Sequence, residues 1–151
     1  MIEAICAHVH NYFTAAEDIH TGTWTIADGA IDLSEFLQTG QYFRILGSAL
    51  NDGVYRYPAQ PEQGKPPILI DETFTGEIWA MKVPRAVVNL AAEIAEWQQK
   101  YGAAAASPYQ SESFGGYSYT KAAGANGSAA GDADAWKGVY RSRLNEWRKL
   151  Q

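Results

Sequence analysis

The chain has 151 residues, of which 46% are apolar and 19% charged, and it carries a net charge of −5. This composition is typical of a globular domain and excludes a disordered chain. Cys6 is the only cysteine, so an intrachain disulfide scaffold is also excluded. No signal peptide is visible, and no apolar run approaches the roughly 18 residues that a membrane span needs. We therefore expect a soluble single-domain α+β protein over residues 1–151, made in a reducing cytoplasm.

The charge is unevenly distributed along the chain. Residues 133–151 hold five basic and two acidic side chains, a net charge of +3, which leaves −8 on residues 1–132. An acidic body with a basic tail could pair head to tail with other copies of itself, although a solvated helix face explains the same pattern. An acidic chain is a poor candidate for wrapping nucleic acid.

The first half of the chain predicts one helix and then a sheet. Apolar residues over 2–13 have the i, i+3, i+4 spacing of an amphipathic helix within segment 1–17, and this spacing buries Cys6. Residues 18–83 change to a period near two and predict an antiparallel β-sheet or small barrel. The predicted strands cover 23–26, 30–33, 42–46, 54–57, 68–70 and 77–83. Turns are expected at 28–29 and 51–53, and the proline-rich segment 58–67 predicts a loop.

The second half, residues 84–151, predicts helices on either side of an extended arm. Pro84 suits a helix start, apolar spacing continues over 85–101, and Gly102 is a natural C-cap, although the alanines at 103–106 could extend the helix. Residues 107–121 predict a loop or a hairpin that turns at Gly115-Gly116. Residues 122–133 have the composition of a flexible linker. A last helix is expected over 134–150, with its apolar stripe formed by Trp136, Val139, Tyr140, Leu144, Trp147 and Leu150.

No motif for catalysis or metal binding is recognisable. His8 and His10 are two residues apart and cannot share a helix face, and the paired cysteines of zinc modules are missing. Asp71 and Glu72 are adjacent, so on a strand they would point to opposite faces. The turn at 51–53 lacks the closing glutamate of a calcium loop. The sequence therefore predicts no enzyme, no metal and no cofactor, but a protein that binds other protein surfaces.

The segment 107–121 is the strongest candidate for an interface because it is long, aromatic and nearly uncharged. A two-stranded hairpin is marginally stable alone and gains stability by pairing with the edge of another chain. A loop packed on its own domain is the alternative. The expected interface residues of this arm are Tyr109, Ser111, Glu112, Ser113, Phe114, Gly115, Gly116, Tyr117 and Tyr119. A second candidate interface is the basic last helix, with Lys137, Arg141, Arg143 and Arg148.

The order of a helix, the segment Ser111-Glu112-Ser113-Phe114-Gly115-Gly116-Tyr117-Ser118-Tyr119, a linker and a basic final helix resembles the head–tail connector proteins of tailed bacteriophages and prophages. These are also called head-completion or adaptor proteins. The resemblance covers residues 84–150, whereas residues 18–83 depart from it because the usual connector is mainly helical there. It implies a virion structural protein, made in the bacterial host cytoplasm, that forms a ring, typically a dodecamer, between the portal protein and the tail or stopper proteins. DNA would pass through the ring without sequence-specific binding.

Two other interpretations stay open. Aromatic residues alternate along segments 41–48 and 53–57, which is compatible with a pocket wall in a ligand- or glycan-binding β module. The same alternation would more simply place them on the inner face of a sheet. The chain could also be another tail or accessory structural protein of a phage.

Overall fold

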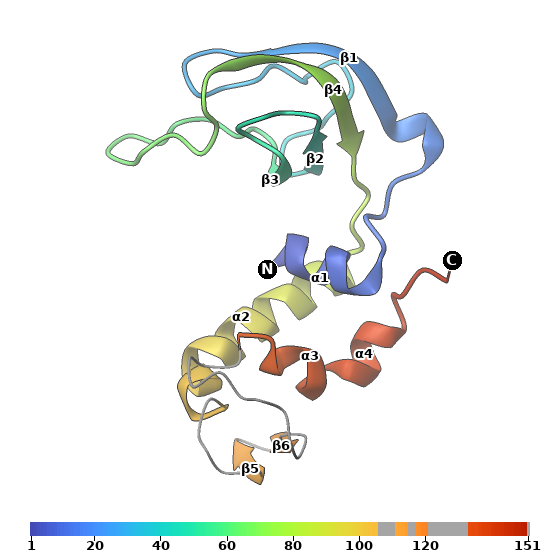
Figure 1. Cartoon of the computed structure of the whole chain (residues 1–151), viewed down its shortest axis with the longest axis vertical. Coiled ribbons are helices and arrows are strands. Elements are labelled where there is room, and N and C mark those ends of the chain that lie inside the picture. The colour runs from blue at the N-terminus through green and yellow to red at the C-terminus, as the bar shows by residue number, and fades with distance from the viewer. Residues whose placement is uncertain (106–110, 115–116, 121–132, 151) are drawn as a thin grey trace. The chain divides into compact units, whose positions relative to one another are not determined.

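The computed structural model describes residues 1–105, 111–114, 117–120 and 133–150, with side chains for 1–101 and 133–150 (Figure 1). Its elements are α1 (Ile2–Val9), the short 3-10 helix η1 (Ala16–Asp18), β1 (Ile19–Ile26), β2 (Tyr42–Leu46), β3 (Gly53–Arg56), β4 (Glu72–Ala80), α2 (Arg85–Ala105), β5 (Ser111–Phe114), β6 (Tyr117–Thr120), α3 (Ala135–Val139) and α4 (Arg141–Asn145). This is the predicted α+β class.

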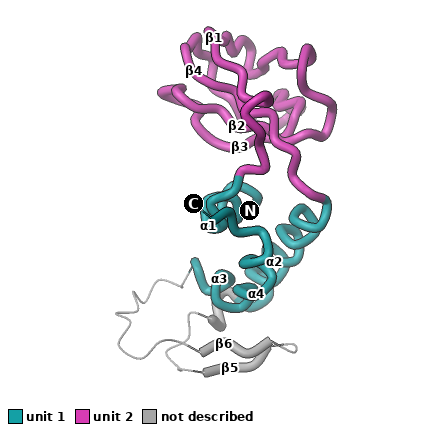
Figure 2. Tube along the Cα trace, turned by 90° about the vertical axis from the view of Figure 1, so that its right-hand side faces the viewer, with its two compact units in different colours: residues 1–11, 85–151 teal, residues 12–84 magenta. Residues whose placement is uncertain are grey.

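The chain divides into two compact units, shown in different colours in Figure 2. Residues 1–11 and 85–151 form the helical unit, and residues 12–84 form the β unit. The helical unit is therefore discontinuous in sequence, with the β unit inserted between α1 and α2. That residues 1–151 make one domain stays a prediction.

The β unit is built on one antiparallel sheet of four strands in the order β1-β4-β2-β3. Of the two architectures that the sequence allowed, the open sheet is the observed one. The central strand β4 begins at Glu72, five residues before the predicted start at Glu77, and so continues through Gly76. A glycine in a strand often marks a close backbone approach. A Cβ at position 76 would lie 2.1 Å from the backbone oxygen of Leu46, so only glycine fits there.

Alternation along the strands gives this sheet one apolar face. Its core includes residues from all four strands or the loops that follow them, with Ile26, Leu33, Phe43, Ile45, Leu69, Phe74 and Ile78 among the most buried. On the opposite face, the hydroxyl groups of exposed threonines on β1 and β4 pair across the strands, Thr23 with Thr75 at 3.0 Å and Thr25 with Thr73 at 3.2 Å. One face of the sheet therefore faces the core and the other carries polar groups.

Two predicted strands of the β unit are wrong. Residues 30–33 make only an isolated bridge, from Ala27 to Ala30, around a turn in which Asp28 and Gly29 have φ values of 53° and 71°. Residues 68–70 pair with no strand within the described chain. Each segment still contributes to the core, because Leu33 and Leu69 are buried. Burial without strand pairing gives the same apolar signal as a strand.

The helical unit begins with α1, which is shorter than the predicted helix over 2–13. Its buried residues are Ile2, Ile5, Cys6 and Val9, as the spacing predicts. The helix ends because His10 adopts a left-handed conformation with φ 54°. The N–H of His10 donates to the carbonyl of Ala7. A left-handed residue just after the last turn is a common helix C-terminus.

The long helix α2 starts directly after Pro84 and buries the predicted stripe of Val87, Leu90, Ala91, Ile94 and Trp97. It does not stop at Gly102, as the C-cap prediction required, but continues to Ala105. One glycine costs a helix about 1 kcal/mol relative to alanine, and the alanines that follow have the highest helix propensity of all residues. The alternative of an alanine extension is therefore the one observed.

The predicted last helix over 134–150 is instead two short helices, α3 and α4, separated at Tyr140. Gly138 and Val139 lower helix propensity just before the break. Trp136, Tyr140 and Leu144 are buried, but the expected stripe ends there, because Trp147 is half-buried and Leu150 is 89% exposed. The predicted linker 122–133 lies outside the described residues, except for its last position.

Candidate functional site

The arm between α2 and α3 contains an antiparallel hairpin. Ser111 pairs with Thr120, and Phe114 pairs with Tyr117. Within the described part of the chain β5 and β6 pair only with each other, so the outer edge of each strand has no strand partner there. This confirms the hairpin alternative for the segment. Open strand edges present N–H and C=O groups that can pair with another chain.

Six of the nine predicted arm residues lie in the part of the chain that the structure describes. Ser111, Glu112, Ser113, Phe114, Tyr117 and Tyr119 lie on β5 and β6. Tyr109, Gly115 and Gly116 fall outside the described residues. The backbone of α3 lies beside β6, so the arm lies close to the last helices of the same unit. Whether these residues form an interface stays a prediction.

Of the four basic residues predicted as a second interface, Lys137 and Arg143 form ion pairs within the helical unit, and whether the four form an interface stays a prediction. Lys137 forms an ion pair with Asp134 at 2.8 Å, and its side chain is half-buried. Arg141 and Arg148 are exposed, and Arg148 lies near enough to α1 to lower the pKa of His8, although burial of that ring contributes more. The charge of Lys137 is therefore partly neutralised within its own unit.

Arg143 is held by Glu93 of α2. Its two terminal nitrogens contact the two carboxylate oxygens at 2.6 and 3.0 Å, which is the two-pronged geometry that makes arginine–carboxylate pairs specific. This hydrogen bonding keeps the pKa of Glu93 below its ordinary value. The pair connects α4 to α2, so Arg143 orders its own unit, a role that the sequence could not show because Glu93 is 50 residues away.

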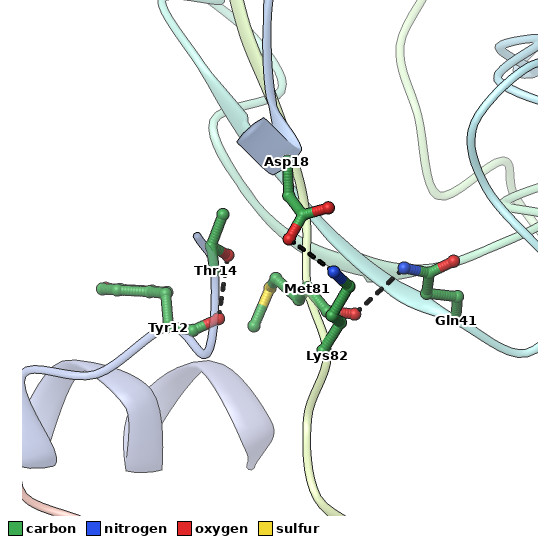
Figure 3. A network of polar contacts seen from close by, with 6 residues as sticks. All are labelled: Tyr12, Thr14, Asp18, Gln41, Met81 and Lys82. Carbon is green, nitrogen blue, oxygen red and sulfur yellow. Dashed lines mark hydrogen bonds and ion pairs between the residues drawn. The ribbon is translucent and has the colours of Figure 1, made fainter. Parts of the chain in front are cut away.

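Contacts between the two segments that enter and leave the β unit hold its ends together (Figure 3). The N–H of Lys82 donates to the carbonyl of Phe13 at 2.8 Å, and its ammonium pairs with Asp18 at 2.8 Å. The side-chain amide of Gln41 donates to the carbonyl of Met81 at 3.2 Å. The ends of the β unit thus lie side by side, which is the geometry that lets a module be inserted into another fold.

An aromatic and cationic stack lies on the outer face of the sheet, and no local sequence pattern predicts it. The guanidinium of Arg44 lies 3.8 Å from the ring centre of Tyr12 and 4.8 Å from that of Trp79. Arg44 and Trp79 are cross-strand partners on β2 and β4, so only the strand register brings them together. Arginine over aromatic faces is attracted by their π electrons.

The aromatic residues considered for a pocket wall lie mostly on the inner face instead. Phe43 is completely buried, and Tyr55 and Tyr57 pack against the same core, with ring centres 5.7 and 6.2 Å from that of Phe43. The hydroxyl of Tyr55 donates to the carbonyl of Asn51 at 2.8 Å. The inner-face interpretation of these rings is therefore confirmed.

The turn before β3 is fixed by a polar network around Glu72. The carboxylate accepts hydrogen bonds from the hydroxyl of Ser48, from the N–H of Ala49 at 3.0 Å and from the side chain of Asn51 at 3.0 Å. The Ser48 hydroxyl is the main cause that lowers the pKa of Glu72. Every donor of this network belongs to the turn, so we interpret it as structural.

Replacing Glu72 with glutamine should make the stability of the β unit less dependent on pH. The lowered pKa means that ionised Glu72 stabilises the fold above its unfolded pKa of about 4.3, and that this contribution is lost as the pH falls through the lower folded value. Urea unfolding followed by tryptophan fluorescence, from neutral pH to about pH 3, should show the two proteins converging. Glu35→Gln, at an exposed position, is the control. A gap that stays constant with pH would contradict this role.

Comparisons with protein families, with curated proteins and with solved structures find no match to this chain. No helix among the described residues is long and apolar enough to cross a membrane. In the same residues, no three His, Cys, Asp or Glu side chains are grouped so that they could hold a metal ion.

Proposed function

We propose that this chain is a structural subunit of a bacteriophage or prophage head–tail connector, which assembles as a ring between the portal protein and the tail or stopper proteins. The proposal rests on the resemblance of residues 84–150, which coincide closely with the second part of the helical unit. In this proposal the chain is not an enzyme. Its partners are other copies of itself and the proteins above and below the ring, and DNA passes through the ring without sequence-specific binding.

The observation that carries the proposal is the hairpin of β5 and β6. It lies between a long helix and the last helices, in the order that connectors have, and both of its outer edges lack a strand partner in the described chain. Because a hairpin of two strands is only marginally stable, strand pairing with a neighbouring copy would stabilise it.

The charges of the two units supply the unlike faces that a ring requires. A ring forms when one face of a subunit fits a different face of the next. The β unit holds ten acidic and four basic side chains, a net charge of −6, whereas the helical unit holds seven acidic and eight basic side chains, a net charge of +1, with +3 on residues 133–151. Attraction between acidic and basic surfaces favours head-to-tail contacts over contacts between like faces.

The inserted β unit explains why the resemblance is interrupted. Its two ends are held together by Lys82, Phe13 and Asp18, so the insertion need not change how α1 and α2 fold. A surface module of this kind would contact the outside of the ring or a tail component. A ligand-binding role for the β unit has the Tyr12–Arg44–Trp79 stack in its favour, but Arg44 already covers one face of both rings.

The test is assembly of a variant whose strands cannot pair. Ser113→Pro with Ser118→Pro removes one amide donor from each strand, and proline is poorly tolerated inside a ladder. We expect the wild-type chain to form a closed ring alone or on the portal protein of the same phage, and the double proline variant to lose it, as seen by mass photometry. Ser113→Ala with Ser118→Ala keeps both amides and should still assemble.

Two results would contradict the proposal. A wild-type chain that stays monomeric and ignores the portal would favour the ligand-binding β unit, and a glycan screen would follow. A proline variant that assembles normally would show that the arm does not hold the ring. Circular dichroism of both variants must match the wild type, since a loss of helix signal would mean that the arm belongs to the core.

A further inference from the structure

Three large apolar side chains are exposed on two segments of the β unit that are bonded to each other. Leu50, Ile68 and Ile70 are 56%, 61% and 53% exposed, and we call them the apolar patch. They belong to two segments that the buried side chain of Asn51 joins: it accepts from the N–H of Ile70 at 2.8 Å and donates to its carbonyl at 2.9 Å. Leu50 therefore lies in the turn that is bonded directly to the segment of the two isoleucines.

The backbone of both patch segments is fixed, one by a buried neighbour and the other by hydrogen bonds. Leu69, between the two isoleucines, is completely buried in the core of the β unit, so its neighbours on either side remain at the surface. Ser48 and Glu72 fix the turn that carries Leu50, because the Ser48 hydroxyl accepts from the N–H of Leu50 at 3.2 Å and donates to the Glu72 carboxylate. Apolar side chains that are exposed next to one another, unlike single ones, are typical of surfaces that bind partners.

Acidic residues lie on the same segments as the patch or on segments bonded to them. Asp71 follows Ile70 directly and binds the N–H of Gly29 at 2.7 Å, which brings Asp28 to the same place. Asp52, two residues after Leu50, accepts a hydrogen bond from the N–H of Ser48 at 2.8 Å. Asp28, Asp52 and Asp71 are all exposed. Lys65, on the preceding loop, forms an ion pair with Glu62, so this pair adds no net charge. A fitting partner is apolar with positive charge beside it.

The segment after α4 has this chemistry. Arg148 and Lys149 are exposed and basic, and Leu150 is 89% exposed. Hydrogen bonds hold the start of this segment within the helical unit: the side chain of Asn11 donates to the carbonyl of Trp147 at 3.1 Å, and the N–H of Lys149 donates to the carbonyl of Val9 at 3.0 Å. Leu150 is apolar like the side chains of the patch, and the charges of Arg148 and Lys149 are opposite to those of the three carboxylates.

We infer that the apolar patch of one copy receives residues 148–150 of the next copy in the ring. This inference rests on the proposed function and names one of its contact surfaces. A contact of three residues is far smaller than the roughly 800 Å² per partner of a stable interface. It is therefore weak between two free copies, and gains strength when ring closure adds further contacts between the same subunits.

The test is disulfide cross-linking between two different copies. Ile68→Cys in one chain and Leu150→Cys in the other place thiols at exposed positions, and Cys6 is completely buried and does not compete. We expect a covalent heterodimer with oxidised glutathione as the oxidant. The control replaces Ile68→Cys by Ala16→Cys, an exposed position in η1 before β1 begins, and should give none. Arg148→Glu with Lys149→Glu in the Leu150→Cys chain should abolish the cross-link, as should about 1 M salt, where the Debye length is only about 3 Å.

The outcomes separate this inference from the proposed function. A ring that forms without the Ile68–Leu150 cross-link overturns the docking and leaves the connector. A cross-link in a chain that never forms a ring supports the docking and overturns the connector. Disulfide dimers of two Ile68→Cys chains would show that the patch contacts the same patch of another copy. A cross-linking yield with Ala16→Cys equal to that with Ile68→Cys would show that the thiols meet by random collision. Either result overturns the inference.

Discussion

Replacing Phe43 with alanine should lower the free energy of unfolding of the β unit by about 3–5 kcal/mol, the cost of deleting a buried aromatic ring. Phe43 is completely buried on β2, and the rings of Tyr55 and Tyr57 pack against it. Its removal leaves a cavity beside the central strand that neighbouring strands cannot fill without breaking their register. Native-state hydrogen exchange of amides in β2 and β4 measures the loss in the β unit by itself.

Phe43→Leu is the matched control for this experiment, because it keeps most of the apolar volume and should cost less than half as much. Tyr42→Ala, on the neighbouring position of the other face, removes a half-buried ring and should also cost less. A loss below about 1 kcal/mol for Phe43→Ala would mean that the ring is not part of a packed core.

Replacing Trp136 with alanine should destabilise the helical unit by a similar amount, about 3–5 kcal/mol. Trp136 is 2% exposed, and the His8 ring packs edge-on against it with ring centres 5.8 Å apart. This contact joins α3 to α1 across more than a hundred residues of sequence. Urea unfolding followed by circular dichroism at the helix wavelength reports the effect.

Trp147→Ala tests whether the stability lost with a tryptophan depends on how deeply its ring is buried. Trp147 belongs to the same predicted stripe but is only half-buried, and its carbonyl, not its ring, accepts the hydrogen bond from Asn11 at 3.1 Å. We expect this substitution to cost clearly less than Trp136→Ala. Equal costs for the two tryptophans would show that the last residues pack as one continuous helix, as the sequence alone suggested.

Most of the elements could be predicted because their signals are local. The spacing of Ile2, Ile5, Cys6 and Val9 needs only the period of a helix, and the dense run at 42–46 is a strand at the predicted residues. The hairpin also follows from local features, since two glycines separate two extended segments. The candidate arm residues follow from the same local pattern, together with a resemblance in the order of elements.

The predictions that failed depended on contacts between distant residues. Leu69 resembles a strand residue because it is apolar, but it is buried without strand pairing. The strand predicted over 77–83 starts instead at Glu72 and includes Gly76, where the approach of Leu46 requires a glycine. No local pattern distinguishes these cases, because burial and backbone approach depend on the whole packed unit.

The sequence by itself determined the class of fold, the helix faces and the separation of an acidic body from a basic tail, all of which depend on residue type and spacing. Only the tertiary structure decided that Arg143 is paired with Glu93, that Arg44 lies against Tyr12 and Trp79, and that an acid-rimmed apolar patch is exposed on the β unit. Each of these joins residues far apart in sequence. The residue type of Leu50 does not distinguish it from a leucine of the core. Its place next to the segment of Ile70 follows from the bond between Asn51 and Ile70, which forms only when two distant segments meet.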